Sequence, residues 1–186
     1  MPLNAFLASV ERRAYRMALL AAREHADALD IVQDAMFSLV KHYAEKPATE
    51  WPLLFQRILQ NRILEWHRHQ TRSKRWFSRW FSNSVDEDEE DPLALVEDPQ
   101  EGDPQVLLAR AGDINIVLKC VEALPVRQQQ AFLLRAWEGL DVADTAAAMQ
   151  CSEGSVKTHY FRAIQTLRQT FVQAHAPVAD QREGKS

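Results

Sequence analysis

The sequence has little glycine, little cysteine and no long apolar run, and each shortage excludes a class of protein. The five glycines among 186 residues form no phosphate-cradling loop. Residues that favour helices dominate and runs of β-branched residues are scarce, so we expect an all-α fold. Cys120 and Cys151 are too few and too widely spaced for a disulfide framework or a zinc site, so we expect reduced thiols. Neither a membrane span of about 20 apolar residues nor a signal-peptide pattern is evident. We therefore expect a cytoplasmic protein without stable membrane insertion.

Residue groupings typical of enzymes are also missing. His67 and His69 lie in an "HRH" triplet, but no acid or cysteine at close spacing completes a metal site. No nucleophile stands beside a suitable base. We expect no catalytic residues, no bound metal and no cofactor.

The net charge of −4 hides a division along the chain. Residues 1–81 carry 13 basic and 8 acidic side chains, and residues 114–186 carry 8 and 7. Residues 82–113 carry one basic and 11 acidic side chains, with six consecutive acids at 86–91 and three prolines after them. Such a stretch buries too little apolar surface to fold alone, so we interpret it as an acidic linker.

Helical spacing of apolar residues fills the remaining sequence. Two stripes run through Phe6–His42, one from Phe6 to Leu20 and one comprising Leu29, Val32, Met36, Phe37 and Val40. Asp27 is a plausible cap for the second of these helices. Further helices are expected at 53–72, from about 106 to 121, and at 126–138, 141–149 and 153–173. These elements predict two small helical domains, 1–81 and 114–175, followed by a disordered tail at 176–186.

A helix-turn-helix is indicated in the second domain. "DVADTAAAM" supplies a small-residue helix, "QCS" a three-residue turn, and Ser152 a cap for the next helix. Val156, Tyr160, Ala163, Ile164 and Leu167 form its inward stripe. The outward polar, basic and aromatic residues are of types that contact bases and phosphates in a major groove.

Two blocks of sequence resemble one known family. "LPVRQQQAFLLRAWEGLDVADTAAAMQCSEGSVKTHYFRAIQTLR" (124–168) resembles the domain of extracytoplasmic-function sigma factors, in the sigma-70 family, that reads the promoter −35 element. "ADALDIVQDAMFSLVKHY" (26–43) is similar to the family's polymerase-docking helix, and "LFQRILQNRILEWHRH" (54–69) to its −10-reading helix. The resemblance implies a sigma-region-2-like domain, a region-4-like domain and a subunit that directs transcription initiation.

The resemblance also implies partners and contact residues. The expected partners are core RNA polymerase, through the clamp helices of its largest subunit and its flap, promoter DNA, and an anti-sigma factor. The implied polymerase contacts are Asp30, Ile31, Val32, Gln33 and Asp34, although Ile31 and Val32 also fit simple core packing. The implied −10 contacts are Arg57, Asn61, Arg62, Trp66 and Arg68, with core packing an alternative for Trp66. The implied −35 contacts are Arg135, Ser155, Lys157, Thr158, Phe161 and Arg162.

Several positions leave the promoter preference open. Gln150, Glu153 and His159 depart from the residues that are usual in the family, and so does the loop "AEKPATEWPLL" that would form part of the −10 base pocket. The acidic linker could be a solvated tether or could mimic nucleic acid inside the polymerase. The basic aromatic segment "RSKRWFSRWF" (72–81) suits contact with nucleic acid, polymerase, an anti-sigma factor or an anionic membrane.

Two other readings compete with a sigma factor. A stand-alone helix-turn-helix regulator with an N-terminal sensing or dimerisation domain would bind duplex DNA without polymerase. A helical adaptor without a DNA role would leave the recognition helix and the basic run at 57–79 unexplained.

Overall fold

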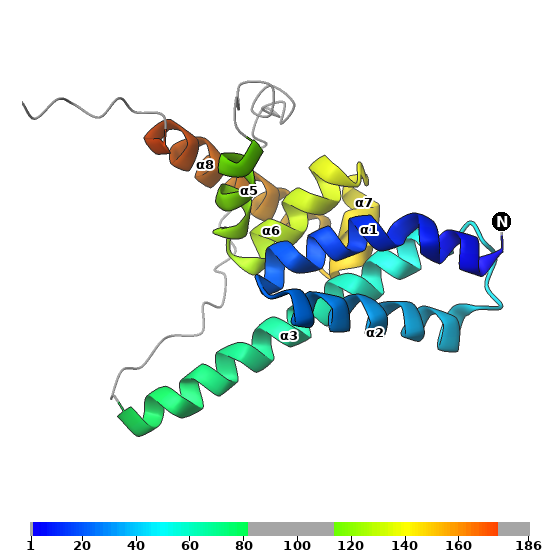
Figure 1. The fold of residues 1–186 in the computed structure, drawn as a ribbon. Helices are drawn as coiled ribbons and strands as arrows, with labels where there is room; N and C mark the ends of the chain where they lie inside the picture. Colours follow the sequence, from blue (N-terminus) through cyan, green and yellow to red (C-terminus); the bar gives the residue numbers. More distant parts are fainter. Residues whose placement is uncertain (1, 82–113, 175–186) are drawn as a thin grey trace, which may run out of the picture.

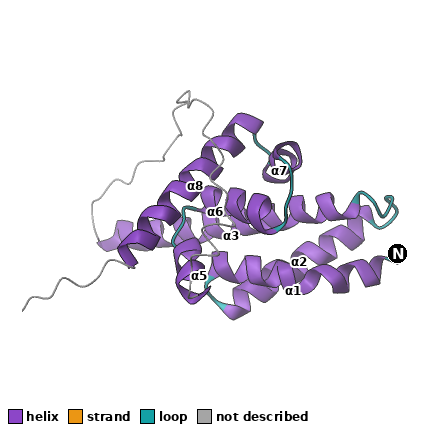
Figure 2. Cartoon of the chain, turned by 90° about the horizontal axis from the view of Figure 1, so that it is seen from above, coloured by secondary structure: helices purple, strands orange, loops and turns teal. Residues whose placement is uncertain are grey.

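A computed structural model describes residues 2–81 and 114–174, and every regular element in these ranges is helical (Figures 1 and 2). The expected all-α fold is confirmed. The expected linker at 82–113 and the tail at 176–186 lie outside the described residues.

Three helices make up the N-terminal half. They are α1 (Leu3–Ala22), α2 (His25–Tyr43) and α3 (Trp51–Phe81). Arg23 ends α1 in the left-handed conformation, with φ of 61°, and its backbone N–H donates to the Leu19 carbonyl. The chain then turns at once into α2, so α1 and α2 pack as an antiparallel pair beside α3 (Figure 1).

Two helix starts differ from the sequence prediction. Glu24, not Asp27, precedes α2, and no side chain caps the helix; Asp27 lies in the first turn, where a carboxylate interacts favourably with the helix dipole. Helix α3 begins at Trp51 with Pro52 in its first turn, a position that proline tolerates because the missing N–H has no helical partner. The segment 72–81 continues α3 as helix rather than forming a separate element.

The described part of the C-terminal half, residues 114–174, contains five elements. They are α5 (Ile114–Glu122), α6 (Val126–Phe132), a π-helical turn η1 (Leu133–Trp137), α7 (Val142–Met149) and α8 (Glu153–Ala174). The π-turn continues α6, and Gly139, with φ of 72°, follows it and redirects the chain into α7. The expected helix at 126–138 is therefore present but ends in a wider turn.

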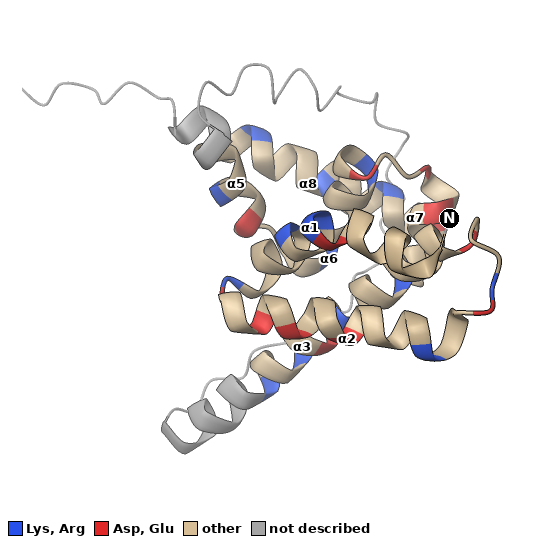
Figure 3. Ribbon diagram, turned by 45° about the vertical axis from the view of Figure 1, so that its right-hand side comes forward, with Lys and Arg blue, Asp and Glu red and all other residues tan. Residues whose placement is uncertain are grey.

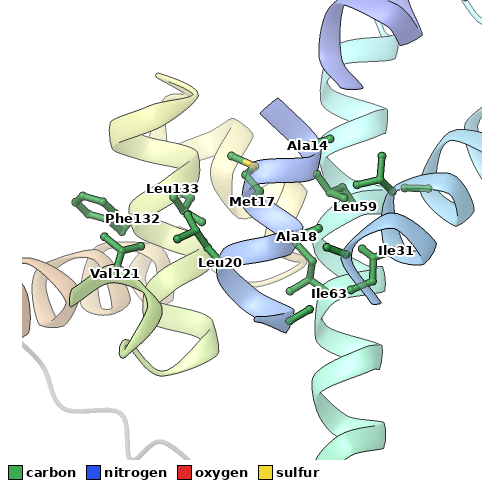
Figure 4. Packing of buried hydrophobic residues seen from close by; sticks show 14 of the residues in the cluster. Ala14, Met17, Ala18, Leu20, Ile31, Leu59, Ile63, Val121, Phe132 and Leu133 are labelled. Atoms are coloured by element: carbon green, nitrogen blue, oxygen red, sulfur yellow. The ribbon is translucent and has the colours of Figure 1, made fainter. Parts of the chain in front are cut away.

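One hydrophobic core runs through both halves. Figure 4 shows α1 in the middle: Ala18 packs on the side of Ile31 and Ile63, whereas Leu20 faces Leu133 and Val121 of the C-terminal half. A second, smaller cluster joins the helix-turn-helix residues Ala146, Met149 and Val156 to Leu53 of α3. The two halves consequently form a single packed body in this structure.

Candidate nucleic-acid and polymerase interfaces

The helix-turn-helix is held by two side-chain caps. Asp141 Oδ1 accepts a 2.7 Å hydrogen bond from the backbone N–H of Asp144 at the start of α7. Ser152 Oγ accepts one of 3.1 Å from the backbone N–H of Ser155 at the start of α8, which confirms the predicted cap. Between the caps, Gln150 takes φ of 53°, and the Cys151 N–H reaches back to the Ala146 carbonyl at 3.1 Å. These contacts set the angle between α7 and α8.

The inward stripe predicted for α8 is buried. Val156, Ala163, Ile164 and Leu167 are all within the core, and Tyr160 packs against it. On the other side of the helix, Lys157 is exposed, while Thr158, Phe161 and Arg162 are half-buried. The structure therefore places these four predicted −35 contacts on the side of α8 that is not buried in the core.

Two hydroxyls of that face also have local partners. Ser155 Oγ lies 2.9 Å from Ser152 Oγ, and Thr158 Oγ1 donates to the Gly154 carbonyl at 3.0 Å. Ser155 is thus part of the helix cap. Ser155 would contribute to DNA binding by fixing the orientation of α8 as much as by a hydrogen bond from its own hydroxyl to DNA.

Arg135 lies on the π-turn, next to the recognition helix. Its guanidinium carbon stands 5.8 Å from the ring centroid of Tyr160, in a cation–π arrangement, and its Nη1 donates to the Leu140 carbonyl. The extra residue in a π-turn displaces the side chains that follow it relative to a regular helix. The sequence predicted Arg135 as a contact but gave no sign of the π-turn that positions it.

Helix α2 has a face that combines acids with exposed apolar groups. The predicted residues Asp30, Gln33 and Asp34 are exposed, whereas Ile31 and Val32 are 5% and 4% exposed and pack in the core. Ile31 and Val32 are therefore not available as surface contacts in this structure. Figure 3 shows the acidic residues along one side of α2.

Three apolar residues on that face belong to the apolar stripe predicted from the sequence. Leu29, Phe37 and Val40 are 49%, 67% and 42% exposed, the only large hydrophobic residues classed as exposed in the described ranges. Helical spacing places Leu29, Gln33, Phe37 and Val40 along one stripe beside Asp30 and Asp34. We name these six residues the α2 face. The missed signal was the width of the apolar stripe, which exceeds what one buried side of α2 accommodates.

The predicted −10 residues lie along α3, with Arg68 exposed and the others half-buried. Arg57 Nη2 donates to the Tyr43 hydroxyl oxygen at 3.2 Å, and its guanidinium carbon lies 5.9 Å from the Tyr43 ring centroid. Arg62 Nη1 is 3.0 Å from Glu65 Oε2. Trp66 packs against the core, as its alternative reading predicted. Arg57 and Arg62 thus have internal partners that a phosphate would have to replace or share.

The described residues contain no group of three or more His, Cys, Asp or Glu that could hold a metal ion. Within the same ranges, no helix is long and apolar enough to cross a bilayer.

Comparison with known proteins identifies the helix-turn-helix. Residues 114–167 match the family model for sigma-70, region 4. The chain is 31% identical over 71 residues to the ECF RNA polymerase sigma factor SigD of Mycobacterium tuberculosis; the match covers 38% of this chain and 34% of SigD. It is 43% identical over 51 residues to the ECF RNA polymerase sigma factor BldN of Streptomyces coelicolor, covering 27% of this chain and 19% of BldN.

Longer matches reach into the N-terminal half. The chain is 27% identical over 148 residues to the RNA polymerase sigma-E factor of Streptomyces antibioticus, which covers 77% of this chain and 69% of that protein. Among solved structures, the sigma factor RpoE from Bartonella quintana, crystallised with the anti-sigma factor NepR, has a similar fold: the TM-score is 0.61 at 22% identity, over 90% of this chain and 95% of that one. Residues 114–167 thus match sigma-70, region 4, and parts of the chain are similar in sequence to extracytoplasmic-function sigma factors.

Proposed function

We propose that this protein is an alternative sigma factor that binds core RNA polymerase and directs initiation at promoters with particular −10 and −35 elements. The observation that carries the proposal is the doubly capped helix-turn-helix, which lies inside the region 4 match and keeps Lys157 exposed on α8. A stand-alone regulator would share this motif, but the sigma-E match covers 77% of the chain and therefore reaches into the N-terminal half. The function involves no catalytic chemistry by this chain.

We assign the two promoter contacts to different halves. Residues 1–81 would bind core polymerase and the −10 element, and residues 114–175 the −35 element. In the −10 half, Arg57, Arg62 and Arg68 would follow phosphates, while Asn61 could both donate to and accept from the edge of an unstacked base. Trp66 packs against the core, so it would stabilise the position of α3 rather than stack on a base.

The α2 face is the surface that we assign to core polymerase. Its exposed apolar groups can be buried against a partner, and Asp30 and Asp34 give it the charge to approach a basic surface. Exposed apolar side chains next to each other on a soluble domain often mark an interaction site. This assignment keeps the predicted acids and replaces Ile31 and Val32 by Leu29, Phe37 and Val40.

In the −35 half, the predicted residues differ in the kind of contact that they can make. Lys157 and Arg135 supply positive charge for phosphates or bases, Arg162 can bond a guanine in a bidentate manner, and Phe161 can contact a thymine methyl group. Ser155 and Thr158 contribute hydroxyls close to the N-terminus of α8. Because that end of a helix carries partial positive charge, it also favours a nearby phosphate.

Run-off transcription tests the proposal directly. Purified core polymerase would be combined with this protein on a DNA fragment carrying the promoter region of its own gene. We expect a defined transcript that requires both proteins. Failure to co-purify with core polymerase, together with absence of a transcript, would refute the assignment; binding to duplex DNA in the absence of polymerase would instead favour the stand-alone regulator.

An anti-sigma factor is a further partner that we propose. The solved relative of similar fold was crystallised with one. Action together with polymerase places the protein in the cytoplasm. Affinity capture with the full-length chain as bait tests this, and an anti-sigma factor should suppress the run-off transcript.

A further inference from the structure

The turn of the helix-turn-helix is held by a residue that lies outside the motif. Arg127 stands in the first turn of α6, 22 positions before Met149, the last residue of α7. Its Nη1 donates to the Met149 carbonyl at 3.0 Å and to Gln130 Oε1 at 3.3 Å. One guanidinium group therefore fastens the end of α7 to α6.

The Met149 carbonyl depends on a donor from elsewhere in the chain. The last four carbonyls of a helix have no partner within the helix. In the turn, the backbone N–H groups of Gln150 and Cys151 both reach back to the Ala146 carbonyl, so they do not serve Met149. Met149 is 1% exposed, and a buried carbonyl without a partner is costly. Arg127 supplies the bond, and its charge also interacts favourably with the negative end of the α7 dipole.

The same guanidinium group lies close to the other side of the turn. Burial raises the pKa of the Cys151 thiol, and the nearby charge of Arg127 partly opposes that rise. Between Met149 and Cys151, Gln150 has φ of 53°, a conformation that a residue with a side chain keeps only when its surroundings impose it. Arg127 contributes to this constraint because it holds the residue that precedes Gln150 and lies beside the one that follows.

Arg127 is itself held in place. Burial lowers the pKa of its guanidinium group, because the charged form has lost part of its water. The Met149 carbonyl and Gln130 Oε1 replace that water as hydrogen-bond acceptors. Gln130 is 2% exposed and donates in turn from Nε2 to the Gln60 carbonyl of α3 at 2.9 Å. Arg127 consequently has a defined position, unlike a solvated surface arginine.

The orientation of α8 depends on how the turn is held. Only residues 150–152 join α7 to α8. Ser152 fixes the first turn of α8 to this segment through its cap, and Arg127 fixes the segment to α6. Lys157 and Arg162 lie on the helix that follows, and side chains that bond a base must be held within about 0.5 Å of the productive position. A shift of the turn therefore changes promoter recognition without altering any DNA-contacting residue.

We propose that Arg127 is a positioning residue for promoter recognition: from outside the helix-turn-helix it fixes the turn, and through the turn it fixes how α8 meets the −35 element. This rests on the proposed function for the identity of the DNA site. The contact between Arg127 and Met149 lies within the C-terminal half, so its effect on the turn can be measured without DNA. Arg127 touches no base in this role.

Amide hydrogen exchange on the free full-length chain is the first test. Arg127→Met keeps a long side chain in the space but removes the donor. The backbone N–H groups of Gln150, Cys151 and Ser155 should then exchange about tenfold faster, since a hydrogen bond from a charged donor contributes about that factor. Exchange in the buried parts of α1 and α2 should stay unchanged, which shows that the variant is folded. Arg16→Met, which removes an exposed arginine of α1, is the matched control.

Run-off transcription with core polymerase is the second test, on one promoter with an intact −35 element and one with an altered element. Arg127→Met should lower the ratio of the two transcripts by about tenfold, whereas Arg127→Lys, which keeps a cationic donor, should stay within about threefold of wild type.

Three outcomes would overturn the positioning role. An equal loss from both promoters would leave the ratio unchanged and indicate a general loss of folded protein. Amide exchange no faster than in the Arg16→Met control would show that Arg127 does not hold the turn. A lower ratio with unchanged exchange would show that Arg127 contacts DNA itself. If the wild-type protein directed no transcription, the proposed function would fail, yet the exchange measurement would still decide whether Arg127 fixes the turn.

Discussion

At the residue scale, the turn of the helix-turn-helix contains a conformational strain that can be removed. Gln150 adopts φ of 53°, a conformation that costs a side-chain-bearing residue about 1–2 kcal/mol and glycine much less. We expect Gln150→Gly to raise the free energy of unfolding by about 0.5–1 kcal/mol, after the greater flexibility of glycine in the unfolded chain is subtracted. Urea denaturation followed by circular dichroism measures this.

Gly139 provides the opposite substitution. It has φ of 72°, and an added Cβ would meet nothing within 4 Å, so Gly139→Ala isolates the backbone cost and should lose about 1 kcal/mol. If both substitutions stabilised the protein, the positive φ angles could not be the cause of the stability differences. The sequence shows that Gln150 is unusual in the turn. Only its backbone angle allows a change in the free energy of unfolding to be predicted.

Glu138 gives a prediction that depends on pH. Burial raises the pKa of its carboxyl group above the usual 4.5, while the charge of Arg13 and hydrogen bonds from Arg13 and Gln56 lower it in part. As pH rises from about 4.5 through the raised pKa, the unfolded state releases the proton first, so this residue makes folding less favourable. The stability of Glu138→Gln relative to wild type should therefore rise over this interval. A difference that stays constant with pH in urea denaturation would contradict this.

At the scale of elements, α2 separates surface contacts from core contacts. Phe37 is 67% exposed, so Phe37→Ala should leave the stability nearly unchanged and weaken polymerase binding by about 2 kcal/mol, about thirtyfold in Kd. Ile31→Ala should do the reverse and destabilise the fold by about 2–5 kcal/mol. Denaturation and a binding titration with labelled core polymerase measure both effects. Equal losses of binding at equal stability would show that Ile31 is a surface contact after all.

Helix α8 carries a second prediction at this scale. Lys157→Ala combined with Arg162→Ala removes two cationic side chains from the proposed DNA face, so initiation that depends on the −35 element should fall by tenfold or more. Binding to core polymerase should persist because the α2 face is untouched. Run-off transcription on promoters with and without an intact −35 element provides the measurement. A parallel loss of polymerase binding would show that this face has another role.

The sequence predicted those features of the helices that are determined by neighbouring residues, and it missed those that depend on distant parts of the chain. The Ser152 cap and the inward stripe of α8 follow from neighbouring residues, and both are present. The exposure of Phe37 depends on which surface of α2 is covered by distant helices, and no local sequence signal marks the π-turn that carries Arg135. Periodicity marks an apolar residue, but it does not say whether that residue meets the core or a partner.

At the scale of the whole molecule, two domains in the sequence correspond to one core in the structure. Because one cluster of buried residues runs from α1 to α8, thermal unfolding of the full chain should give a single calorimetric transition. Two resolved transitions would show that the halves unfold independently at the scan temperature. The sequence could not predict this docking, since Gln129 and Gln130, which are buried between the halves, resemble surface residues when read along the chain.

The connection between α2 and α3 has a consequence for how promoter preference could evolve. Tyr43 closes one end: its carbonyl accepts from Trp51 Nε1 at 3.1 Å, and its hydroxyl accepts from Arg57. The chain between Tyr43 and Trp51 is thus fastened at both ends by contacts that its own side chains do not make. Loops anchored in this way tolerate changes of length and composition at small cost to the framework. If the segment 44–50 forms part of the −10 base pocket, as the resemblance implies, its sequence can change the preferred base without altering the helices on either side.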